Sequence, residues 1–179
     1  MKHWTDEDID QAALMTIAKS RIMARDQQIQ PVLFLLVARP DGQREISIFG
    51  MRGNKDEIAA DIQHLVRASG AEAALFVNES WAVSLDHPTN EQKAEVIRCQ
   101  REGRLQYHPD VREIIALEIE TDEGRKVMMQ SVITGDMPNR VTAEPTTVDL
   151  TGTDSEGRFL NFFDEVRFER MIAKIGAED

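Results

Sequence analysis

The sequence predicts a single layered α+β domain: a mainly antiparallel sheet of about five strands with helices packed on it. Three observations predict this class. Apolar strand candidates come in pairs joined by short turns, apolar residues recur at helical spacing in several segments, and 179 residues with 41% hydrophobic side chains suffice for one core. The expected order is helix, strand, strand, helix, strand, insert, strand, strand, loop, helix.

The first 70 residues contain two helix signals around one hairpin. Thr5 can cap a helix that runs to about Arg25, with carboxylates in its first turn. "VLFLLVA" and "REISIFG" are strand candidates joined by the turn sequence "RPDG", so they predict a hairpin whose first strand is buried on both faces. Asn54 and Glu57 form a capping box for a second helix that Gly70 ends.

The rest of the chain predicts three more strands. "AALFVNESWAVSL" is followed by an insert, residues 86–111, with a short polar helix, and then by "REIIALEIET" and "RKVMMQSVIT", joined by "DEG". We expect residues 1–134 to form the core domain and residues 135–158, rich in Thr, Pro, Gly and Asp, to form a loop or arm. Residues 159–179 predict an amphipathic helix on the core, with these apolar residues at helical spacing: Phe168, Met171, Ile172 and Ile175.

Composition argues against several classes of protein. A net charge of −11 and a pI near 4.8 oppose direct binding to nucleic acid phosphates. The longest apolar run is too short to cross a bilayer, and the acidic N-terminal segment is unlike a signal peptide, so we expect no membrane association and a cytoplasmic location. The single Cys99 excludes an internal disulfide and a multi-cysteine zinc site. No cofactor-binding motif is present, so no cofactor is expected.

Two carboxylates interrupt apolar rows of the predicted strands. In a regular strand Glu79 shares a face with Leu75 and Val77, and Glu113 leads the row of Ile115, Leu117 and Ile119. A carboxylate in such a row must be paired, hydrogen-bonded or protonated. We expect it to be paired with an arginine or with backbone amides, and the candidate arginines are Arg112, Arg52 and Arg125.

A different hypothesis makes the same carboxylates part of a catalytic site. If the insert folds back over the sheet, His87, His108 and Asp110 could converge with Glu79 and Glu113. Two imidazoles with two or three carboxylates suit a divalent transition metal and metal-assisted hydrolysis, or acid/base hydrolysis without a metal. The spacing matches no known metal motif, so the pairing hypothesis is preferred and no metal is favoured.

The stretch "YHPD" resembles the signature of J-domain co-chaperones, in which a His-Pro-Asp loop joins two antiparallel helices. That resemblance implies a working loop at His108, Pro109 and Asp110. The segment after the loop, however, is "EIIALEIET", whose β-branched and alternating residues predict a strand. The J-domain interpretation is therefore rejected, and the tripeptide is interpreted as the turn that starts a strand.

Two further resemblances suggest function classes. "ESW" followed downstream by "HPDVRE" resembles a signature of small uncharacterised bacterial and phage-type proteins, which implies no activity. The order of elements resembles that of roadblock and longin-like domains, which are scaffolding modules. We therefore expect a protein-interaction or regulatory module without catalysis that binds a protein partner or pairs with itself as a homodimer. The alternatives are the hydrolase described above and an acidic mimic of nucleic acid.

Overall fold

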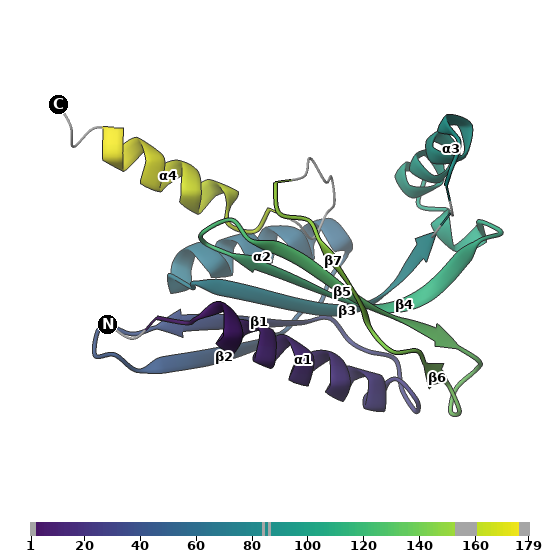
Figure 1. The fold of residues 1–179 in the computed structure, drawn as a ribbon, viewed down its shortest axis with the longest axis horizontal. Coiled ribbons are helices and arrows are strands. Elements are labelled where there is room, and N and C mark those ends of the chain that lie inside the picture. Colours follow the sequence, from purple (N-terminus) through teal and green to yellow (C-terminus); the bar gives the residue numbers. More distant parts are fainter. Residues whose placement is uncertain (1–2, 84, 86, 153–160, 176–179) are drawn as a thin grey trace.

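The computed structural model describes residues 3–83, 85, 87–152 and 161–175 of the chain, and it has the predicted α+β class (Figure 1). Over these residues, four α-helices accompany an antiparallel sheet of seven strands. In chain order the elements are α1 (Asp6–Met23), β1 (Val32–Ala38), β2 (Arg44–Gly50), α2 (Lys55–Ser69), β3 (Ala73–Val83), α3 (Asn90–Arg101), the short 3-10 helix η1 (Leu105–Tyr107), β4 (Val111–Thr121), β5 (Lys126–Thr134), β6 (Val141–Thr142), β7 (Thr146–Asp149) and α4 (Asp164–Ile175).

The sheet has the order β2-β1-β3-β4-β5, and both β6 and β7 pair with the outer side of β5. The last two strands raise the number from the expected five to seven, and they fall in the segment expected to be a loop or arm. Every residue of β7 is exposed. These strands form by backbone pairing along the edge of β5, which does not require their side chains to be buried. For this reason no hydrophobic pattern in the sequence predicts them.

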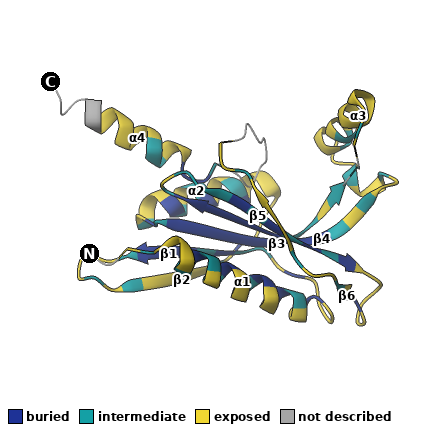
Figure 2. Ribbon diagram, viewed as in Figure 1, coloured by how far each residue is buried: buried dark blue, intermediate teal, exposed yellow. Residues whose placement is uncertain are grey.

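Helices cover both faces of the sheet and create two cores. On one face α1 packs on alternate residues of β3, β4 and β5, such as Leu75, Leu117 and Met129. On the other face α2 and Phe163, the residue just before α4, cover Leu35 and Phe76. Figure 2 shows that the middle strands are buried while α3 and α4 are mostly exposed. Because the central strands are covered on both sides, they have continuous apolar runs.

The two main helices begin at the predicted caps. The Thr5 hydroxyl accepts a hydrogen bond from the Asp8 amide, and the Asn54 carboxamide accepts from the amides of Asp56 and Glu57. In both helices the third residue completes a capping box by bonding back to the cap. Gly70 ends α2 in the left-handed conformation, with φ of 64°. Within the described ranges, no helix has the length and apolar character that a bilayer span requires.

Replacing the cap of α2 tests how much this local signal contributes. We expect Asn54→Ala to lower the free energy of unfolding by about 1 kcal/mol, because two amides of the first turn lose their acceptor. Urea denaturation measures the change. Asn90→Ala is the matched control, since Thr89 caps α3 and Asn90 follows it. A change at Asn54 no larger than the change at Asn90 would contradict the role of the cap.

The insert stands apart from the body of the sheet. It is carried on the ends of β3 and β4, and α3 rises from it with no buried residue (Figure 1). His108 and Pro109 follow η1 directly, and the Val111 amide donates to the His108 carbonyl oxygen at 3.1 Å. The next element is strand β4, so the His-Pro-Asp sequence lies at a turn that leads into the sheet.

Candidate functional site

Glu79 and Glu113 lie on the same face of two neighbouring strands. In the β3–β4 register Glu79 is opposite Ile115 and Glu113 is opposite Trp81, so the two carboxylates are diagonal neighbours. Leu75 and Val77, which precede Glu79 on this face, belong to the core under α1. The pair therefore lies where the apolar row of the α1 face ends.

Arg140 is the partner of both carboxylates. Its Nη2 lies 2.7 Å from Oε1 of Glu79 and 2.9 Å from Oε1 of Glu113, and its Nη1 donates to Oε2 of Glu79 at 3.3 Å. The Ile29 amide donates to the same Oε2 at 2.9 Å. Only 3% of the Arg140 side chain and 5% of the Glu79 side chain is exposed. We call Glu79, Glu113 and Arg140 the Arg140 cluster.

The expected pairing of these carboxylates with an arginine is found, but the arginine is not one of the three candidates. Arg125 binds Asp6 and Asp10 of α1 instead. Arg112 alternates with Glu113 along β4 and so points to the opposite face. Arg140 comes from the loop between β5 and β6, 61 residues after Glu79. No local pattern marks it, because its burial depends on where that loop closes against the end of α1.

The pKa values of the two carboxyl groups move in opposite directions. Burial would raise the pKa of Glu79, but hydrogen bonds from Arg140, Glu113 and the Ile29 amide hold it below its ordinary value. Burial and the hydrogen bond to Glu79 raise the pKa of Glu113, and they outweigh the opposing effect of Arg140. Glu113 is therefore the member of the pair that carries a proton more readily. Such a division is also seen in acid/base pairs of enzymes.

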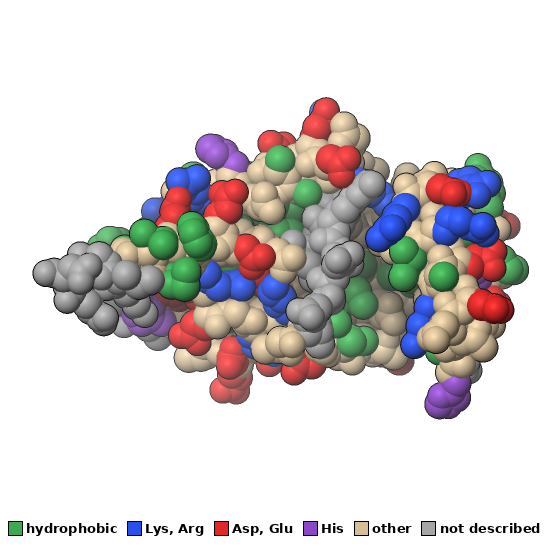
Figure 3. All heavy atoms as spheres, turned by 90° about the horizontal axis from the view of Figure 1, so that it is seen from above, with side chains coloured by type: hydrophobic (Ala, Val, Ile, Leu, Met, Phe, Trp, Pro, Cys, Tyr) green, Lys and Arg blue, Asp and Glu red, His purple; other side chains and the backbone are tan. Residues whose placement is uncertain are grey.

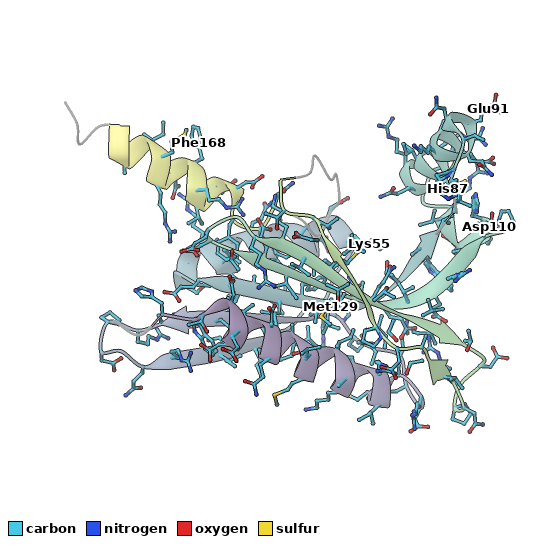
Figure 4. All side chains as sticks on the ribbon, in the orientation of Figure 1. Lys55, His87, Glu91, Asp110, Met129 and Phe168 are labelled. Carbon is cyan, nitrogen blue, oxygen red and sulfur yellow. The ribbon has the colours of Figure 1, made fainter. Side chains whose placement is uncertain are left out.

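The insert residues form a separate group. The Asp110 amide donates to Nδ1 of His108 at 3.1 Å, and both residues line a hollow of about 140 Å³ with Leu85, Gln92 and Glu95. His87 is exposed on the insert, where Figure 4 labels it with Asp110. The structure thus brings Glu79 and Glu113 together on Arg140 and places His108 with Asp110. Among the residues described, no group of three or more His, Cys, Asp or Glu could hold a metal ion.

Two further glutamates are buried on the opposite face of β4, and sequence reasoning did not single them out. Glu120 accepts a hydrogen bond from the Phe162 amide at 2.6 Å and pairs with Arg167, which ties α4 to the sheet. Glu118 lies between Phe76 of β3 and Met128 of β5, and its Oε2 has no hydrogen-bond partner among the described residues. Burial raises the pKa of Glu118 from 4.5 to about 8. The available signal in the sequence was "IALEIE", in which Glu118 and Glu120 follow Ala116 at every second position and so share one face of the strand.

The larger of the two hollows described lies at the start of α1. It has a volume of about 580 Å³, and its lining includes Trp4, Glu72, Asp122 and Arg170. Glu72 is occupied there by the Trp4 amide and by His3, and Asp122 by Arg170. Neither hollow is lined by the carboxylates of the Arg140 cluster. Comparison of the chain with protein-family models, with curated proteins and with solved structures finds no match.

Proposed function

We propose that this chain is a non-catalytic protein-interaction module that associates with itself. The observation that carries the proposal is the free edge of the sheet at β2. In the described part of the chain β2 pairs with β1 alone, and its side chains Ile46 and Ile48 are 45% and 63% exposed. An edge strand offers unpaired N–H and C=O groups to another chain.

The edge lacks the usual protection against pairing. Proteins commonly block edge strands with lysine, proline or a bulge, and β2 pairs with β1 residue by residue over its whole length without any of them. Its two charged residues, Arg44 and Glu45, are both bound within the chain: Arg44 to Asp8, and Glu45 to Arg39. The remaining five residues of the strand are uncharged. Association through β2 therefore requires no burial of an unpaired charge.

A second apolar surface supports an interaction role. Glu165 and Glu169 of α4 pair with Arg67 of α2, while Arg167 and Arg170 pair with Glu120 and Asp122 at the end of β4 and just after it. The helix thus turns its charged sides toward the protein. The side chains of Phe168, Met171 and Ile172 are left exposed, and Figure 4 shows Phe168 pointing away from the sheet. Figure 3 looks onto this side of the molecule and shows hydrophobic side chains at its surface.

Hydrolysis at Glu79 and Glu113 is the second candidate, and the opposite pKa shifts of these groups favour it. It has less support, because Arg140 occupies both carboxylates and Glu79 is nearly inaccessible. Added zinc, manganese or nickel should raise the melting temperature if these residues and His87 or His108 bind a metal. If added metal leaves the melting temperature of the wild-type protein unchanged, as it should for Glu79→Gln, the metal-dependent form of this candidate is contradicted.

Sedimentation velocity tests the proposed self-association. Over a range of roughly 1 to 500 μM we expect the full chain to shift from monomer to dimer, since the population of a dimer follows protomer concentration. The shift should persist at moderate salt, because apolar side chains and backbone groups form the contact. A strict monomer at the highest concentration would overturn the proposal.

A further inference from the structure

The free backbone groups of β2 can be assigned residue by residue. Next to the strand, the Arg39 amide donates to the Gln43 carbonyl oxygen at 2.8 Å and the Met51 amide donates to that of Pro31 at 2.9 Å. In an antiparallel pair every second residue bonds to the partner strand. The odd-numbered residues of β2 therefore direct their backbone N–H and C=O groups toward β1. The even-numbered residues Arg44, Ile46, Ile48 and Gly50 direct N–H and C=O groups toward the free edge.

This alternation of backbone groups restricts the register in which the β2 strand of a second copy could pair with this edge. Even-numbered residues must lie opposite even-numbered residues, so the two-fold axis can pass through Ile46, Ser47 or Ile48 near the strand centre. An axis at Ser47 places Ile46 opposite Ile48 of the second copy, and Ile48 opposite Ile46. An axis at either isoleucine instead places the other isoleucine opposite Arg44 or Gly50. Only the axis at Ser47 pairs all four isoleucines.

The charges beyond the strand fit the same register. With the axis at Ser47, Arg52 lies opposite Gly42 of the second copy, beside Asp41 in the turn that joins β1 to β2. Arg52 is exposed, and the structure gives it no ion pair with any described residue. The Asp41 carboxylate is exposed and accepts the nearby Gln43 amide at 2.9 Å, and it makes no ion pair within the described ranges. The two-fold axis repeats this contact, so an arginine and an aspartate meet at each end of the paired strands.

The geometry points to a second copy of this chain as the occupant of the β2 edge, in an antiparallel register centred on Ser47. The inference rests on the proposed function and adds the partner, the contact and the register. The apolar pairs and the charge pairs are complementary under one two-fold axis, which an unrelated strand would match only by coincidence. The two sheets join into one continuous sheet, and the exposed faces of Ile46 and Ile48 are covered by each other across the junction.

Cysteine cross-linking tests the register. In a Cys99→Ser background, Ser47→Cys should form an interchain disulfide under mild oxidation. Residues opposite each other at a non-hydrogen-bonded position have Cα atoms about 4.5 Å apart, which a disulfide can span. Ile46→Cys in the same background is the matched control. Its two cysteines would be offset diagonally along the strands, beyond the roughly 7 Å limit for a disulfide, so it should stay uncross-linked.

A charge substitution tests the same contact without oxidation. Ile48→Lys should weaken the dimer at least about tenfold in sedimentation, because it places a charge at the apolar junction. Ile97→Lys on α3, where the side chain is 48% exposed, should leave the dimer unchanged. Circular dichroism should show that both variants are folded, because neither side chain is buried.

The outcomes separate this inference from the proposed function. Cross-linking of Ser47→Cys alone, with loss of the dimer in Ile48→Lys, supports both. Cross-linking of Ile46→Cys instead overturns the register. A wild-type dimer that neither cysteine traps and Ile48→Lys does not weaken overturns the β2 contact, while self-association stands. A wild-type monomer overturns the inference and the proposed function together.

Discussion

Replacing Arg140 with leucine is expected to lower the free energy of unfolding by about 3–5 kcal/mol, the range for removing one partner of a buried ion pair. Among the described residues Arg140 is the side-chain cation of the cluster, and without it Glu79 keeps a buried carboxylate whose remaining hydrogen bonds come from the Ile29 amide and Glu113. The pKa of Glu79 is lowered in the folded protein, so its contribution to stability is present at neutral pH and is lost as pH falls through that pKa. Arg140→Leu should remove this contribution.

Urea denaturation at neutral pH measures the change, and two comparisons identify its cause. Arg112→Leu alters an exposed arginine on β4 and should change stability by no more than about 0.5 kcal/mol. Combining Arg140→Leu with Glu79→Leu should recover much of the loss, because the nearly inaccessible carboxylate is then removed and the one left without its arginine, Glu113, is 28% exposed. The ion-pair explanation would be wrong if the double variant were less stable than Arg140→Leu alone.

Glu118→Met is expected to stabilise the protein at pH 8 and to have little effect at pH 4. Burial raises the pKa of Glu118 to about 8 from 4.5, so the folded protein holds a proton that the unfolded chain releases above pH 4.5. This glutamate therefore lowers stability progressively as pH rises from about 4.5 to 8. The difference in pKa corresponds to a gain on the order of 4 kcal/mol for the variant at pH 8, at 1.36 kcal/mol for each pH unit.

Thermal or urea unfolding across this pH range measures the effect as a change of slope. Methionine has a similar length and no charged group, and it fits between Phe76 and Met128. Glu123→Met, at an exposed position in the β4–β5 turn, is the control and should leave the slope unchanged. Equal pH dependence in Glu118→Met and wild-type protein would show that this carboxyl group does not titrate with a raised pKa.

The two glutamate sites have different consequences for function. In the Arg140 cluster the charges are matched, which suits a tie between β3, β4 and the loop before β6. Glu118 has an unpaired Oε2 on the other face of the sheet and is a source of instability at neutral pH. Neither site requires a ligand to explain its position. The exposed apolar residues on β2 and α4 are features that the fold leaves unexplained.

Local signals in the sequence predicted most of the fold. The caps Thr5, Asn54 and Thr89, the terminator Gly70 and the apolar residues at helical or strand spacing predicted four helices, five strands and the antiparallel arrangement. These signals involve residues within a few positions of each other. The edge strands β6 and β7 were missed because their pairing uses backbone groups and leaves most of their side chains in solvent.

The sequence by itself determined that Glu79 and Glu113 each interrupt an apolar row of a strand and need a partner, because strand alternation and the penalty for a buried charge are local properties. Only the tertiary structure decided that this partner is Arg140 and that Phe168, Met171 and Ile172 of α4 are left exposed. Those outcomes depend on which distant segments meet when loops close. The residue types within a short stretch of sequence do not predict which distant segments come into contact.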